Sequence, residues 1–93
     1  MIRITTTASY QNDILSLNEG LKEYEIRDRC RKALTRMVVL LMQKAEKNDV
    51  LKGMASVIVS MDGLKAFYGI SDAELDDAIR MQLFDMVREN DGR

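Results

Sequence analysis

Apolar residues recur every three or four positions between Glu25 and Asn48, which is the spacing of one face of an α-helix. Neither Pro nor Gly interrupts this segment, so we predict one continuous helix over residues 25–48. The positions on its apolar face are Ile26, Cys30, Ala33, Leu34, Met37, Val38, Leu41 and Ala45.

Six consecutive apolar residues, Met37 to Met42, lie within this helix. They surround the helix instead of forming a stripe, so we expect this level to be buried on every side. The run is far shorter than the roughly 20 residues that cross a bilayer. We therefore predict no membrane anchor.

The first ten residues alternate between two faces and are rich in β-branched side chains, which is typical of a strand. A strand needs a partner for its backbone groups. That partner is either a second short strand near residues 14–17, after a turn at residues 11–13, or the same strand in a second copy. From Ser16 we expect a short helix, with either a break or kink near Tyr24 or contacts on both of its faces.

Two further helices are predicted. Asn48 and Asp49 end the first long helix and cap the next, over residues 50–68, although residues 55–61 also alternate as a strand would. Gly69 and Ile70 fit a left-handed helix stop.

Ser71 and Glu74 form a capping-box pattern that starts a helix running to about Asn90. We expect residues 91–93 to fray. The inward side chains of this helix are expected to be Leu75, Ile79, Leu83 and Met86. Met81, Phe84 and Val87 point elsewhere and give the helix a second apolar surface.

Together these segments predict one mainly α domain, a bundle of three to four helices with a short N-terminal strand. With 93 residues, such a domain buries only somewhat more than about 60% of its unfolded surface, so we expect a dimer. Seven Met residues suggest an adaptable core or contact surface. A single Cys and the lack of a secretory signal pattern favour a reducing cytoplasm.

Enzyme chemistry has few candidate residues here. The chain has no His, which excludes imidazole-based triads and metal sites, and its five Gly residues have no phosphate-loop spacing. Cys30 lies between two Arg residues but on the apolar helix face, so a structural role is expected. Asp72 and Asp76 are expected to be a solvated helix N-terminus and not a cation site. We predict no enzyme activity, no cofactor and no metal.

Charge is distributed unevenly. Residues 1–47 carry 9 Lys or Arg and 6 Asp or Glu, whereas residues 48–93 carry 5 and 9. The positive charges concentrate in a basic ridge consisting of Arg27, Arg29, Arg31, Lys32 and Arg36. Pairing with nearby carboxylates is one interpretation of this ridge, and contact with phosphates or an acidic protein surface is another.

Residues 1 to about 40 resemble a ribbon-helix-helix regulator, since a strand with Arg3, Thr5 and Thr7 on one face precedes two helices. The resemblance implies a dimer whose paired strands enter the DNA major groove. Residues 67–79 resemble the turn and second helix of a helix-turn-helix unit. The carboxylates on that second helix would repel phosphates.

We expect a non-enzymatic regulator, inhibitor or adaptor that binds another protein and itself forms a homodimer. The expected contact residues are Arg27, Arg31, Lys32, Met81, Phe84 and Val87. The alternative is a DNA-binding regulator that uses Arg3, Thr5, Thr7, Arg27 and Arg31.

Overall fold

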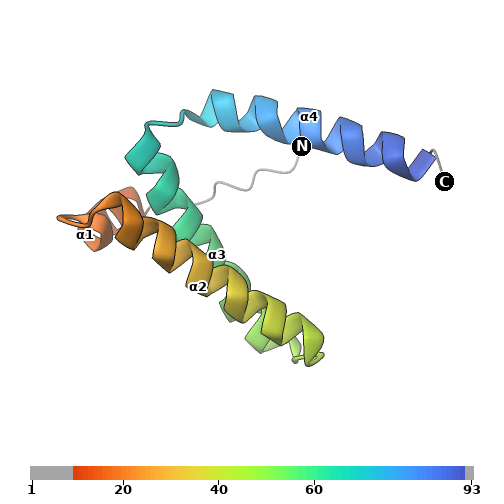
Figure 1. Cartoon of the computed structure of the whole chain (residues 1–93), viewed down its shortest axis with the longest axis horizontal. Helices are drawn as coiled ribbons and strands as arrows, with labels where there is room; N and C mark the ends of the chain where they lie inside the picture. Colours follow the sequence, from red (N-terminus) through yellow and green to blue (C-terminus); the bar gives the residue numbers. More distant parts are fainter. Residues whose placement is uncertain (1–9, 92–93) are drawn as a thin grey trace.

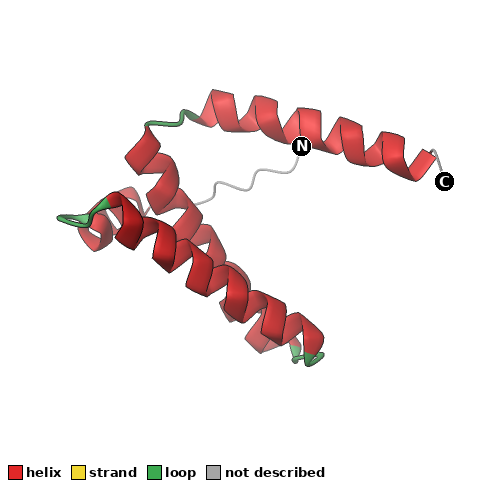
Figure 2. Cartoon of the chain, in the orientation of Figure 1, coloured by secondary structure: helices red, strands yellow, loops and turns green. Residues whose placement is uncertain are grey.

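The computed structural model describes residues 10–91 and contains four helices and no strand in this part of the chain (Figure 2). The helices are α1 (Gln11–Asn18), α2 (Glu23–Met42), α3 (Lys47–Tyr68) and α4 (Asp72–Asp91). The chain is therefore mainly α, as predicted. The predicted N-terminal strand, with Arg3, Thr5 and Thr7, lies outside the described residues except for Tyr10, which precedes α1.

The predicted turn at residues 11–13 and the alternative strand near residues 14–17 are both wrong, because these residues form α1. The break that we expected near Tyr24 occurs slightly earlier, at residues 19–22. Gly20 there adopts a positive φ of 77°, which costs Gly little because it has no Cβ. The backbone N–H of Lys22 donates to the Glu25 carboxylate at 3.3 Å, and this bond helps to start α2.

α2 and α3 form an antiparallel hairpin, and α1 packs against α3 (Figure 1). The hairpin turn comes earlier than predicted, because α2 ends at Met42 and not at Asn48. Lys44 adopts a left-handed φ of 52°, and the N–H groups of Lys44 and Ala45 donate to the carbonyls of Leu41 and Leu40. This is a helix stop that usually carries Gly. A Lys at this position gives no signal in the sequence.

The helical interpretation of residues 50–68 is confirmed, and the strand alternative for residues 55–61 is wrong. α3 approaches α2 through small residues. A Cβ on Gly53 would lie only 2.8 Å from Leu40 Cδ1 and 2.9 Å from Met37 Sδ. Ser60 is buried against Cys30, whose Sγ donates to the Ser60 carbonyl at 3.1 Å. Small side chains therefore line the hairpin seam, and larger apolar ones lie beside it.

Gly63 provides the equivalent space for α1. A Cβ at Gly63 would lie 2.5 Å from Asn18 Nδ2. Asn18 in turn donates to the Ile14 carbonyl at 2.8 Å and accepts from Arg29 at 3.3 Å. Ile14, Ile26 and Cys30 are the buried apolar side chains in the described part of the chain, so the core lies where α1, α2 and α3 meet.

The stop at Gly69 and the capping box at Ser71 are both confirmed. Gly69 has a φ of 66°, and the N–H groups of Gly69 and Ile70 donate to the carbonyls of Ala66 and Lys65. The Glu74 N–H donates to Ser71 Oγ at 3.1 Å, and the Ser71 N–H donates to the Glu74 carboxylate at 3.4 Å. α4 then points away from the hairpin (Figure 1).

Two burial predictions fail. The run Met37–Met42 is not buried all round: only Met37 and Leu40 are partly buried, whereas Leu41 and Met42 are 60% and 79% exposed. On α4, Leu75 and Ile79 are half-buried, but Leu83 and Met86 are exposed. Both failures arise because no other helix covers these side chains. The hairpin and α1 leave one face of α2 uncovered, and α4 packs closely against none of the other helices.

We expect Ile26→Ala to lower the free energy of unfolding by about 2–4 kcal/mol, because Ile26 is only 3% exposed and truncation leaves a cavity at the seam. Val39→Ala is the control, since Val39 lies on the same helix and is 44% exposed. Urea unfolding followed by circular dichroism measures both. A loss for Ile26→Ala no larger than that for Val39→Ala would contradict this core.

Candidate functional site

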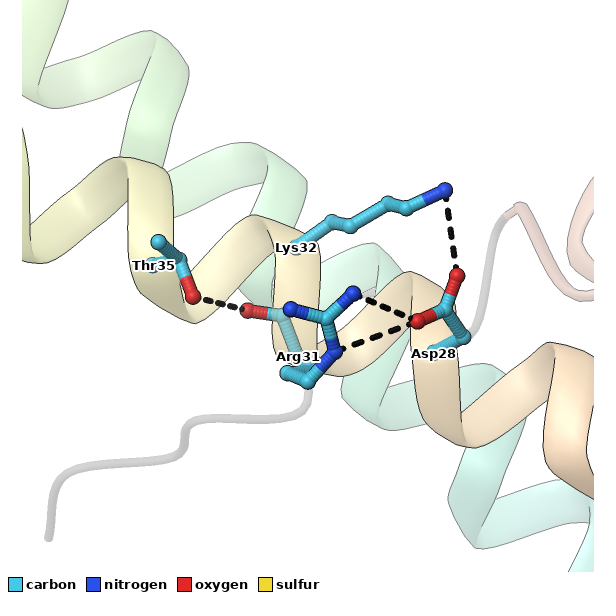
Figure 3. Close-up of polar contacts among 4 residues, drawn as sticks. All are labelled: Asp28, Arg31, Lys32 and Thr35. Atoms are coloured by element: carbon cyan, nitrogen blue, oxygen red, sulfur yellow. Dashed lines mark hydrogen bonds and ion pairs between the residues drawn. The ribbon is translucent and has the colours of Figure 1, made fainter.

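The basic ridge on α2 is largely engaged in local ion pairs. Asp28 accepts from Arg31 at 2.7 Å and from Lys32 at 3.0 Å, both within one turn of α2 (Figure 3). The hydrogen bonds from Arg31 and Lys32 lower the pKa of the Asp28 carboxyl below its usual value. Such exposed pairs contribute little stability each and exchange readily with other partners.

Arg27 links the start of α2 to the end of α3, at the open end of the hairpin. Its Nε donates to the Tyr68 hydroxyl at 2.8 Å, its Nη2 lies 3.0 Å from the Glu23 carboxylate, and the Tyr68 hydroxyl donates to Glu23 at 2.6 Å. The hydrogen bond to Tyr68 and the charge of Glu23 raise the pKa of the Arg27 guanidinium. Arg27 and Tyr68 are therefore neighbours on one face of the hairpin.

This contact identifies an uncovered apolar face. Residues seven positions apart lie on the same side of a helix, so Leu34 and Leu41 follow Arg27 along α2, and Met61 and Met54 precede Tyr68 along α3. Because Arg27 contacts Tyr68, these two rows lie side by side. We call this surface the hairpin face. It consists of Leu34, Val38, Leu41, Met54 and Met61, all of them exposed.

The opposite side of the hairpin is partly covered by α1. Arg29 donates to the Leu17 carbonyl at 3.4 Å and to Asn18, and so fixes α1 beside α2. A shallow groove follows from there between α2 and α3. It is lined by Leu17, Arg29, Lys32, Ala33, Arg36, Ala55, Ser56, Val59 and Ser60. The members of the basic ridge thus divide between two faces, with Arg27 on one and Arg29 and Arg36 on the other.

α4 carries a second uncovered surface, which we call the α4 apolar surface. Phe84 is 63% exposed, and its ring lies 5.8 Å from the Arg88 guanidinium carbon. The exposed members of the surface are Met81, Leu83, Phe84, Met86 and Val87. The structure does not bring this surface to the basic ridge. The contact residues expected on α2 and on α4 therefore form two separate surfaces of one chain.

Cys30 has a structural environment. Its side chain is buried and donates to the Ser60 carbonyl. Burial raises the pKa of the Cys30 thiol, and the charge of Arg29 only partly opposes this shift. The thiol is therefore protonated and weakly nucleophilic at neutral pH.

The acidic start of α4 is tied to the end of α3. Lys65, which is mostly buried, forms an ion pair with Asp72. Burial, followed by the nearby charge of Asp72, raises the pKa of the Asp62 carboxyl, although Lys65 opposes this. No group of three or more His, Cys, Asp or Glu side chains is placed to hold a metal ion within the described residues. In the same part of the chain, no helix is long and apolar enough to cross a membrane.

Comparison with protein-family models, with curated proteins and with solved structures found no match to this chain. The sequence pattern indicates Met81, Phe84 and Val87 as an exposed surface of α4, but it does not indicate the hairpin face, because its periodicity predicts those side chains in the core. The available signal in the sequence was the seven-residue spacing of Leu34 and Leu41 after Arg27, and of Met61 and Met54 before Tyr68. Only the pairing of α2 with α3 shows that these rows are adjacent.

We expect Cys30 to react slowly with a thiol-specific disulfide reagent in native buffer at pH 7 and rapidly in denaturant. The Val39→Cys variant is the matched control, because it adds an exposed thiol on the same helix and away from the hairpin face, and it should show one additional fast-reacting group. Because folding raises the pKa of this thiol, its contribution to stability is complete below the pKa of the unfolded chain and falls as the pH rises through the folded pKa. Equal rates for the two thiols in native buffer would contradict burial of Cys30.

Proposed function

We propose that this chain is a non-enzymatic protein-binding module that acts by occupying a partner protein, as a small regulator, inhibitor or adaptor does, and that it forms a homodimer. The observation that carries the proposal is the uncovered apolar surface of α4, with Phe84 at its centre and no other helix of the chain packed closely on it. Contiguous exposed apolar patches on soluble proteins are typical of interaction sites.

The composition of these surfaces supports the same interpretation. An exposed aromatic ring is a frequent anchor of protein interfaces. Met side chains are flexible and polarisable, which suits them to contact surfaces that adapt to a partner. Met81 precedes Phe84 by one turn on the same face of α4, and Met54 and Met61 lie on the hairpin face. In this proposal most of the binding energy comes from the apolar surfaces. The ridge residues Arg27, Arg31 and Lys32 set orientation and specificity at the rim of the interface.

The alternative function is DNA binding through Arg3, Thr5, Thr7, Arg27 and Arg31. The first three residues lie outside the described part of the chain. Arg31 is paired with Asp28, and Arg27 with Glu23 and Tyr68, so binding to phosphates would first have to release them from these partners. Affinity for a DNA duplex that falls steeply with salt would favour this alternative over protein binding.

We expect Phe84→Asp to weaken self-association and partner capture by at least about 10-fold, because burying a Phe side chain at an interface contributes roughly 1.5–3 kcal/mol and a buried Asp adds a desolvation cost. The helix content should not change, since Phe84 is exposed in the single chain. Light scattering over a range of concentrations gives the assembly state, and pull-down from the native host with mass spectrometry gives the partners.

Gln82→Asp is the control for this experiment. It adds the same charge on the same exposed helix without removing an apolar side chain, so it should leave assembly and capture nearly unchanged. If Phe84→Asp assembles and captures partners as well as the unsubstituted chain does, the proposed function is wrong.

A further inference from the structure

We propose that α4 of one copy packs onto the hairpin face of a second copy, and that the two chains exchange their α4 helices reciprocally. In this arrangement α4 runs parallel to the α2 helix that it covers. The proposal rests on the proposed function, because it identifies a second copy of this chain as the occupant of the hairpin face and defines the homodimer interface.

The two surfaces match in length and character. α4 and α2 each contain 20 residues, which corresponds to roughly 30 Å of helix. Each surface is apolar and exposed within the single chain. An amphipathic helix that lays its apolar face against an exposed apolar surface is an established way to bury both.

The order of charges along the two helices sets the direction. Along the hairpin face, α2 carries Arg27 near its start and apolar side chains toward its end, whereas α4 begins with the acidic segment Asp72–Asp77 and continues with the α4 apolar surface. Only a parallel alignment places acidic residues beside basic ones and apolar residues beside apolar ones.

The net charges agree with this pairing. The hairpin, residues 23–68, carries nine Lys or Arg and six Asp or Glu, and α4 carries two Arg and seven Asp or Glu. Placing Asp76 opposite Arg27 sets Val87 opposite Val38, because each pair of residues on one helix is 11 positions apart. The ion pairs of Arg27 with Glu23 and of Asp76 with Arg80 are exposed and contribute little, but Arg27 would also have to share or release its hydrogen bond to the Tyr68 hydroxyl.

The corner between α3 and α4 holds α4 away from its own hairpin. Gly69 and Ile70 close the end of α3 with two backbone hydrogen bonds, and Ser71 and Glu74 cap the start of α4. Lys65 of α3 also binds Asp72 of α4. These contacts brace the short connection from both sides. Figure 1 shows that α4 diverges from the hairpin as a separate arm. A rigid arm of this kind is suited to exchange between two copies.

The amount of exposed surface is consistent with a missing second chain. The accessible surface is 7626 Å², whereas a compact monomer of 10.6 kDa exposes about 5,500 Å². The radius of gyration is 15.0 Å, against about 12 Å for a compact chain of this length. A stable dimer interface buries about 600–1,000 Å² on each partner, so the excess of one chain is large enough to supply one.

The test is a pair of cysteine substitutions, Val38→Cys and Val87→Cys, in the full chain with Cys30 retained. Val38 lies on the hairpin face and Val87 on the α4 apolar surface, and both side chains are more than half exposed. Mild oxidation of an equimolar mixture of the two single variants should give a covalent dimer joined between positions 38 and 87, as identified by mass spectrometry. The double variant should give a covalent dimer with two such bonds and little oxidised monomer.

The matched control replaces Val38→Cys with Val39→Cys. Val39 is comparably exposed but lies about 100° further round α2, away from the hairpin face. This variant should form at least about 10-fold less of the bond to position 87 under the same conditions. Circular dichroism of each reduced variant checks that the helices are retained.

Three results would overturn the exchange. An oxidised monomer of the double variant with an internal bond would show that α4 folds back on its own hairpin. Equal bonding from positions 38 and 39 would show non-specific contact. The lack of a bond in a chain that light scattering shows to be dimeric would place the interface elsewhere. In this last case, loss of assembly in Phe84→Asp would still support the proposed function, so the two proposals can fail separately.

Discussion

The close contact between α2 and α3 is the constraint on which the rest of the structure depends. Gly53 and Ser60 face α2, and Gly53 lies so near Met37 and Leu40 that even a methyl group would require those side chains to move. Two helices can approach this closely only when one of them presents small residues at the seam. The consequence is that only the large side chains facing these small residues, such as Ile26 of α2, are buried in the seam, and the other large apolar side chains of both helices remain exposed unless another element covers them.

α1 covers one side of the hairpin and leaves the other uncovered. The Asn18 side chain fits against Gly63, and Arg29 holds the end of α1 through the Leu17 carbonyl, so α1 is fixed on the side of the groove. Arg27, Glu23 and Tyr68 close the other side at one end only. The exposed rows that run from this cluster toward the hairpin turn form the hairpin face. An uncovered face of this kind and an extended α4 are two parts of one architecture, since neither buries its apolar side chains within the single chain.

The electrostatics of the chain are mostly local. Asp28 pairs with both Arg31 and Lys32 within about one turn of α2, and Lys65 binds Asp72 across the corner. The exposed pairs of Asp28 determine side-chain orientation more than they determine stability. Beyond these local pairs, the hairpin has a net positive charge and α4 a net negative charge, and this difference favours their association. The same charges therefore serve helix formation within one chain and direct the proposed exchange between two.

The sequence by itself determined the helical class, the stop at Gly69, the capping box at Ser71 and the exposed position of Phe84, because each depends on local periodicity or on backbone chemistry within a few residues. It did not determine the turn at Lys44, since no residue type there marks a left-handed helix stop. It also did not determine how far the run Met37–Met42 is buried. Burial depends on which helix faces which, and this was decided by the small residues of α3, which a sequence analysis counts only as weak helix formers. The tertiary structure alone brought Arg27 beside Tyr68 and so revealed the hairpin face, because these residues are 41 positions apart and no local rule joins them.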